Sequence, residues 1–499
     1  MTIALTLLED VRWRGIPVAG DRPQALLAAL AARDCRPVGP AELIELVWGD
    51  EAPSNGMKSL QVLVSRARSA CGPDAIVRDG VGYRLGAAPA EVDSARLLVL
   101  SQAVVDALRD WTPPPDLADA ARAAVAIVLS NTQLMSSQLS SPLLTLLRRY
   151  GPDTGADVYL SSLVRVLLAY DPADDVGFPT RLAELAEDPD RHTAATASLR
   201  LSHQRENDGD LAGALEAAQR ALALVGDDDG PWIRAMPHTV LAELSMQIGD
   251  GDAAVGHARA ALPVMCRLGA SDDEMQLRAL LVLCSIAAGR LTEAADELDR
   301  FEGVDERVTP FGGSFFRYIC RAELLIASGD AEAGLRVYHE CSTRLRELEF
   351  PDLATPGTEP WSLFGDALGL AAYAWYAAAP DEAHGRTMFA DCRAGVLRVL
   401  TPESGRLDYP AVGMLLYALG AWSLLRRAAP PRDALRLLAL ADRFAYNRMI
   451  PTMLWERIAP LAEQALPGAL DELQAQYAAR RPSDLLAEAR RATERLAAE

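Results

Sequence analysis

The chain has 499 residues, half of them hydrophobic and only 6% aromatic, and a formal net charge of −20 at pH 7. This composition is typical of a helical globular protein of two or three domains and excludes a disordered chain. The sequence has no run of about 20 uncharged apolar residues and no basic start or cleavage site at its N-terminus, so we expect a cytoplasmic protein without membrane contact.

Residues 1–48 have the pattern of a small α+β domain. Three short stretches alternate and break as strands do, at 3–7, 11–14 and 16–18. Two short helices are predicted after them, at 23–33 and 40–48, because their apolar residues recur at helical spacing.

A third helix is predicted at residues 57–71, where Pro53-Ser54-Asn55 supplies a start signal. On a helical wheel, one arc holds the apolar residues Met57, Leu60, Leu63, Val64, Ala67, Ala70 and Cys71. The opposite arc holds Lys58, Gln61, Val62, Ser65, Arg66, Arg68 and Ser69. No acid occurs between Glu51 and Asp74, and this favours a helix that lies against phosphates. The bland alternative is an ordinary solvated face.

A hairpin is predicted at residues 75–85. We expect Asp79-Gly80 and Gly82 to supply the backbone freedom of its tight turn. Arg78 and Arg84 flank the turn, where a wing would reach a neighbouring phosphate. A basic helix followed by such a hairpin is the order that a DNA-binding winged helix requires.

Between residues 94 and 190 we expect a helical linker or activation-like region. Residues 94–110 have a helical pattern, and Pro113-Pro114-Pro115 interrupts it. Two or three further helices are predicted at 116–170.

A 40-residue repeat is present in residues 191–347. Its mark is a glycine followed by Asp or Arg, at positions 209, 249, 289 and 329. An apolar helix precedes each glycine and an Ala-rich helix follows it, which predicts a stack of helical hairpins. Helical pairs and a charged cap are expected to continue through 348–499, with Pro380 and Pro430-Pro431 in place of glycine.

Motifs of catalysis are missing from the sequence. Seven cysteines lack metal-ligand spacing, six histidines lack HExxH, and Gly312-Gly313-Ser314 lacks the GxSxG frame. The only lysine, Lys58, lies in no GxxxxGK[ST] loop, which excludes P-loop nucleotide hydrolysis. Paired acids such as Asp227–Asp229 and Asp272–Glu274 are expected to be solvated charges in turns. We therefore predict no catalytic residue, no cofactor and no metal, and a protein that is not an enzyme.

Four segments resemble the OmpR/PhoB-type winged helix of SARP-type (AfsR-like) actinobacterial transcription regulators. They are Leu26-Leu-Ala-Ala-Leu-Ala, Pro37-Val-Gly-Pro-Ala-Glu-Leu-Ile-Glu-Leu-Val-Trp-Gly-Asp, Leu60-Gln-Val-Leu-Val-Ser-Arg-Ala-Arg and Val77-Arg-Asp-Gly-Val-Gly-Tyr-Arg-Leu. The resemblance covers residues 1–93 and implies that 57–71 is the recognition helix in the major groove and 76–85 the wing. It also implies an activator of a biosynthetic gene cluster that binds double-stranded promoter repeats, with RNA polymerase as a partner.

Residues 191–347 resemble tetratricopeptide (TPR) repeats, and this likeness concerns the fold. The overall expectation is a mainly α protein in which a small α+β winged helix-turn-helix domain precedes a TPR-like α-solenoid. The usual motifs of the family's bacterial activation domain are not found in residues 95–200, and the missing Walker lysine removes the nucleotide-binding domain of its larger members. The repeats are expected to serve homo-oligomerisation, or binding of a partner, a peptide or a small-molecule effector.

Charge is unevenly shared along the chain. Residues 1–95 carry ten bases and twelve acids, a net of −2, so −18 of the total of −20 belongs to the rest. We expect modest DNA affinity per protomer, and dimerisation or tandem sites to compensate for it. The alternative is a TPR scaffold in which the winged helix docks a protein and does not bind DNA.

Overall fold

The computed structural model describes residues 3–7, 11–33, 35–49, 53, 55–80, 82–96, 158–170, 177–268, 270–302, 314–347, 360–378, 381–400 and 408–496. The described residues up to Leu168 belong to one compact unit and those from Ala169 onward to a second. The expected break at Pro113-Pro114-Pro115 and most of the expected helix at 94–110 lie outside the described residues. Among the helices that are described, none is both long and apolar enough to cross a membrane.

The first unit opens with a three-stranded antiparallel sheet. Its strands are β1 (Leu5–Thr6), β2 (Arg12–Trp13) and β3 (Ile16–Pro17). Arg14 and Gly15 connect β2 to β3 with φ values of 47° and 81°, as a two-residue turn between twisted strands requires. The turn places Trp13, which is only 1% exposed, in the core of the unit.

Three helices and a hairpin follow the sheet in the described residues up to Leu85. They are α1 (Asp21–Ala31), α2 (Pro40–Trp48), α3 (Gly56–Cys71), β4 (Ile76–Asp79) and β5 (Gly82–Leu85). The chain then returns to the first strand, where Val92 pairs with Leu5 and the Leu7 amide donates to the Asp93 carboxylate at 2.8 Å. The order of elements is the one predicted, and the expected small α+β domain is confirmed.

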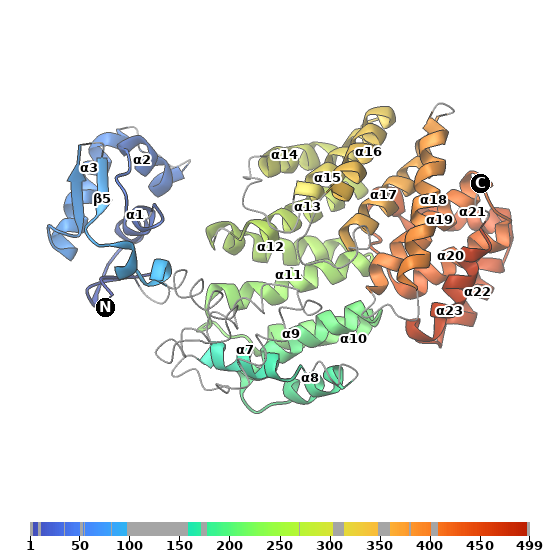
Figure 1. Ribbon diagram of the computed structural model, residues 1–499, viewed down its shortest axis with the longest axis horizontal. Helices are drawn as coiled ribbons and strands as arrows, with labels where there is room; N and C mark the ends of the chain where they lie inside the picture. Colours follow the sequence, from blue (N-terminus) through green and yellow to red (C-terminus); the bar gives the residue numbers. More distant parts are fainter. Residues whose placement is uncertain are drawn as a thin grey trace. The chain divides into compact units, whose positions relative to one another are not determined.

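The second unit is helical throughout its described residues, and Figure 1 shows its helices stacked in pairs. Helix α7 (Val158–Leu168) ends the first unit and α8 (Phe178–Ala186) begins the second. The pairs that follow are α9 (Arg191–Asn207) with α10 (Leu211–Leu224), α11 (Pro231–Ile248) with α12 (Gly251–Leu268), α13 (Ser271–Ala287) with α14 (Leu291–Glu302), and α15 (Ser314–Ala327) with α16 (Ala331–Glu347). These pairs confirm the predicted helical hairpins.

The turn within each hairpin has the same construction. Glycines 209, 249, 289 and 329 have φ values of 73°, 84°, 75° and 95°. The next residue donates its amide five residues back, as Asp250 does to the Ser245 carbonyl at 2.9 Å, so each first helix ends in a Schellman motif. The Asp250 carboxylate then accepts the Ala253 amide and caps the second helix. The Gly-Asp pair thus ends one helix and starts the next, whereas Arg290 in the third turn pairs with Glu293.

Seven further helices form the C-terminal part. They are α17 (Pro360–Tyr376), α18 (Glu382–Val399), α19 (Tyr409–Leu425), α20 (Pro431–Phe444), α21 (Trp455–Ala465), α22 (Ala469–Ala478) and α23 (Leu486–Glu494), with short 3-10 turns η6 (Pro451–Met453) and η7 (Pro482–Leu485). Helix α19 is buried along nearly its whole length and packs against α17 and α20. It also contacts α9, so the solenoid returns to its first repeat. Pro431 opens α20 as expected, and Pro380 lies outside the described residues.

Several acids are more deeply engaged than the sequence predicts. Asp229 is only 6% exposed, because Arg191 pairs with it at 2.6 Å and the Gly226 amide donates to it. Asp272 and Glu274 lie in the first turn of α13 and not in a connecting turn. The expectation of solvated turn charges was therefore wrong for Asp229, because Arg191 of α9 pairs with it. It was also wrong for Asp272 and Glu274, because both belong to α13, where Glu274 pairs with Arg278 of the same helix at 2.8 Å.

The turn geometry predicts opposite effects for two glycines of the same repeat region. Gly289→Ala forces a side chain into a left-handed backbone and should cost about 1–2 kcal/mol. Gly256→Ala in the exposed middle of α12 should instead stabilise the protein by about 0.5–1 kcal/mol. Urea unfolding midpoints of the two variants test this. Equal midpoints would show that the left-handed turn does not constrain the repeat.

Candidate nucleic-acid interface

Helix α3 has defined ends. The Asn55 side chain accepts the Lys58 amide at 3.2 Å and caps its start. At its end, Gly72 has a φ of 103° and donates its amide to the Arg68 carbonyl at 2.8 Å. These two signals confirm the predicted helix, which begins one residue earlier than expected.

The buried face of α3 determines how the helix is turned. Its buried side chains are Leu60, Leu63, Val64, Ala67 and Cys71, which lie against α1 and α2. Each buried Leu or Val contributes about 1.5–3 kcal/mol, whereas one hydrogen bond contributes about 1 kcal/mol. Packing therefore decides which arc of α3 faces the core.

The opposite arc of α3 faces solvent. Its exposed side chains are Lys58, Gln61, Val62, Ser65, Arg66 and Ser69. Val62 is 45% exposed, although it is a large apolar residue. Met57 is 50% exposed and Ala70 is also exposed, so their predicted place in the buried arc was wrong. Met57 lies in the first turn of the helix, before its first buried residue, and Ala70 lies in the last turn, next to the buried Cys71.

Two of the predicted DNA-contacting arginines have structural partners. Arg68 is half-buried, and its Nε donates to the Ile76 carbonyl at 2.8 Å, which joins α3 to the hairpin. Arg84 is also half-buried, and its Nη1 donates to the Leu85 carbonyl at 3.2 Å. Arg78 lies exposed on β4. The sequence predicted DNA contact for all three, and only Arg68 is involved in the contact between helix and hairpin.

The hairpin is anchored to the segment before α2. Val38 and Tyr83 exchange two backbone hydrogen bonds, at 2.8 and 3.0 Å. Gly82 is needed here, because a Cβ at that position would lie 1.9 Å from the Val38 carbonyl oxygen. Gly80, in contrast, has no positive φ and open space around it, so the expected need for its backbone freedom was wrong. Gly82 is therefore required by the close approach of the hairpin to Val38, and not by the geometry of the turn.

Asp74, the acid that follows the acid-free stretch after Glu51, forms an ion pair that the sequence analysis did not predict. Arg14, in the turn between β2 and β3, pairs with Asp74 at 2.9 Å. Both side chains are more than half exposed, so this pair contributes little to stability. It does offset the negative charge between α3 and the hairpin. No pattern in the sequence joins residues 60 positions apart.

The exposed arc of α3 and Arg78 of the hairpin offer several hydrogen-bond donors and the apolar side chain of Val62. Lys58, Arg66 and Arg78 provide cations, Gln61 can both donate and accept, and Val62 offers methyl groups. Among the described residues of α3 there is no acid. Such a face is suited to phosphate oxygens and to base edges with a thymine methyl.

The N-terminal part of the chain is similar to two curated regulatory proteins. It is 38% identical over 95 residues to Regulatory protein AfsR of Streptomyces coelicolor, a stretch that makes up 18% of this chain and 10% of that protein. The Regulatory protein AfsR of Streptomyces griseus is 33% identical over 87 residues, or 17% of this chain and 9% of that protein. The matched stretch thus spans about a tenth of each relative. No family model matches the chain.

One solved structure shows a distant likeness over most of the chain. It is a Rap protein complexed with Competence and Sporulation Factor, with a TM-score of 0.40 and 13% identity. The likeness covers 80% of this chain and 100% of that one.

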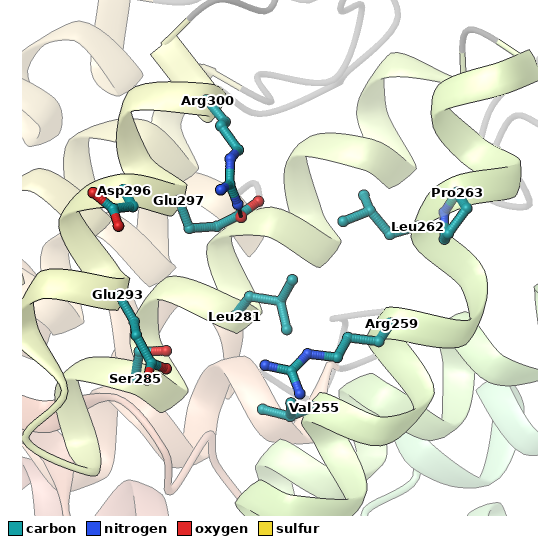
Figure 2. A pocket seen from close by; sticks show the side chains of 10 residues that line it. All are labelled: Val255, Arg259, Leu262, Pro263, Leu281, Ser285, Glu293, Asp296, Glu297 and Arg300. Carbon is teal, nitrogen blue, oxygen red and sulfur yellow. Dashed lines mark hydrogen bonds and ion pairs between the residues drawn. The ribbon is translucent and has the colours of Figure 1, made fainter.

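A pocket of about 420 Å³ lies between α12 and α14. Leu281 and Ser285 of α13 lie between these helices, and Arg259 extends over the apolar side chains (Figure 2). Arg300 on the other side is engaged by Glu297 at 2.8 Å. Because Arg259 and Arg300 are exposed and solvent screens their charges, the pocket points to no particular ligand.

The contact between α3 and the hairpin predicts different outcomes for two neighbouring arginines. Arg68→Ala removes the bond to the Ile76 carbonyl, worth about 0.5–1.5 kcal/mol, and should speed amide exchange in β4 and β5 roughly twofold to tenfold. Arg66→Ala, on the exposed arc, is the matched control and should leave this exchange unchanged. Hydrogen–deuterium exchange measures both. Equal rates in the two variants would refute the anchoring role of Arg68.

Proposed function

We propose that this protein is a sequence-specific DNA-binding transcriptional regulator. The observation that carries the proposal is the exposed, acid-free arc of α3, which lies next to an arginine-bearing hairpin in a chain of net charge −20. The N-terminal similarity to two regulatory proteins supports it. Activation of a biosynthetic gene cluster is part of the proposal.

In the proposed complex, α3 lies in the major groove and the hairpin lies along the neighbouring backbone. Lys58, Arg66 and Arg78 neutralise phosphates or read guanine edges, and Gln61, Ser65 and Ser69 donate to bases or phosphates. Val62 contacts a thymine methyl. Arg68 acts mainly by holding helix and hairpin in register, because its guanidinium group binds the Ile76 carbonyl. The Arg84 guanidinium group already binds the adjacent Leu85 carbonyl within β5.

The small number of exposed cations limits the DNA affinity of a single protomer. A few phosphate contacts give weak binding at physiological salt. We therefore propose that the protein binds double-stranded promoter repeats as a homo-oligomer, since two linked sites raise the effective affinity. The helical repeats would provide the contacts between protomers. They would also bind RNA polymerase or an effector.

Gel-shift titration of the full chain against promoter fragments tests the proposal. Arg66→Ala should weaken specific binding about tenfold or more, since one good contact is worth about 1–3 kcal/mol. If Arg66 contacts a phosphate, the slope of log affinity against log salt should fall by about 0.9. The control is Arg33→Ala, which removes one cation from the same unit but lies in an ion pair with Glu42 at 2.7 Å.

The competing function is a scaffold in which the first unit docks a protein. Unchanged binding in Arg66→Ala, together with loss in Arg33→Ala, would show that the wrong face was assigned to DNA. Absence of any retardation at low salt, with partner binding that salt does not affect, would favour the scaffold.

A further inference from the structure

A cluster of polar side chains lies on the first helices of the second unit. Arg200, His203 and Glu206 are spaced three residues apart on α9 and so share one face. On α11, Gln247 donates its Nε2 to Glu206. Glu243 lies one turn before Gln247 on the same side of that helix.

Two more carboxyl groups come from elements far away in the sequence. Asp408 caps the start of α19, where it accepts the Ala411 amide at 2.9 Å, and α19 contacts α9. Burial raises the pKa of Glu206 to about 7, against the hydrogen bond from Gln247 and with a further contribution from Asp408. Burial, Glu206 and then Asp273 of α13 raise the pKa of Glu243 well above its usual range. The four carboxyl groups therefore interact across three helices and the start of a fourth.

These groups are desolvated and yet accessible. Burial lowers the pKa of Arg200, and burial followed by the charge of Arg200 lowers that of His203 to about 4. All of these side chains nevertheless keep part of their surface in contact with solvent. Strong desolvation with partial exposure is expected in a concavity, because protein surrounds the group on most sides. A small ligand group can therefore reach the cluster.

The balance of charge in the concavity is negative. Among the described residues of the cluster, His203 is neutral at pH 7 and Arg200 supplies one positive charge against four carboxyl groups. Two cations of the helices that pack on α9 are engaged elsewhere. Arg181 of α8 donates to the Ala169 carbonyl, and Arg220 of α10 pairs with Glu187 at 2.7 Å.

Gln247 adds an observation that does not depend on charge. Its side chain is only 8% exposed, and its Oε1 has no hydrogen-bond partner among the described residues. Leaving a buried acceptor unpaired costs about 1–3 kcal/mol. The amide group is aimed into the cluster, because its Nε2 bonds Glu206 there. An unpaired acceptor beside several carboxyl groups is a site for a hydrogen-bond donor with positive charge, and an ammonium group brings three donors.

We propose that this cluster binds an organic cation, an ammonium or guanidinium group, held by Glu206, Glu243 and the Gln247 Oε1. The group can belong to a free polyamine or to a basic side chain of a peptide. Cation binding stands on the geometry of α9, α11 and α19 alone. Its use as an effector signal rests on the proposed function.

Binding of a cation must be linked to protons. The cation favours the ionised carboxylates, whereas burial raises the pKa of Glu206 to about 7 and raises the pKa of Glu243 well above its usual range, so both groups hold protons more strongly than exposed carboxyl groups do. Binding therefore releases protons, and the affinity increases as the pH rises through about 7. A cation attracted only by the general negative charge of the surface would release none.

Calorimetric titration of the full chain tests the proposal. The probes are spermidine and trilysine, each at an ionic strength of about 0.15 M, which screens exposed charges. We expect saturable one-to-one binding of at least one probe. The heat should differ between two buffers of different ionisation enthalpy, in proportion to the protons released. Binding of spermidine alone identifies a free amine as the source, and binding of trilysine alone identifies a peptide.

The decisive variant is Glu206→Gln with Glu243→Gln, which should lower the affinity about tenfold or more and abolish the proton release. Its matched control is Glu216→Gln with Glu332→Gln, which removes the same charge from side chains that are 84% and 80% exposed, and it should bind like the unmodified chain. Equal binding in both double variants, or no binding of either probe, overturns the proposal. Proton release by the unmodified chain is an independent readout if the first variant is unstable. Loss of DNA retardation with intact cation binding would reject only the proposed function.

Discussion

The left-handed glycine at the end of the first helix in each hairpin is the constraint on which the second unit depends. At Gly209, Gly249, Gly289 and Gly329 the chain must take a positive φ, which costs other residues about 1–2 kcal/mol. In three of the four turns the following aspartate caps the next helix with its carboxylate. Because the same turn recurs every 40 residues, successive hairpins have nearly equal lengths and stack in register.

Stacking in register has a chemical consequence. It brings the first helices of successive pairs side by side, so polar side chains from α9, α11 and α13 share one inner surface. The return of α19 to α9 then adds Asp408 to that surface. Four carboxyl groups from residues 206 to 408 meet there. Besides burial, Asp408 raises the pKa of Glu206, and Glu206 and Asp273 raise the pKa of Glu243. Burying several carboxyl groups together costs stability in the protein alone, and a bound cation would offset that cost.

The first unit relies on a different balance. Five apolar side chains hold α3, and their combined burial far exceeds the energy of any single polar contact on the opposite arc. The exposed side chains of α3 are therefore not needed to stabilise the helix. Arg68, which links α3 to the Ile76 carbonyl, is the exception, and it shows that a residue on the polar arc can also join the helix to the hairpin.

Local patterns in the sequence determined the helices of the first unit, the hairpin and the four glycine turns, because apolar periodicity, capping residues and positive φ are properties of short segments. The same patterns identified the acid-free arc of α3. Tertiary structure alone decided that Met57 is exposed, that Arg68 binds the hairpin backbone, and that Gly82 lies against Val38. It also decided that Glu206, Glu243 and Asp408 meet. The physical reason is that these outcomes depend on which segments approach one another, and the sequence around a residue carries no record of the segment that will pack against it.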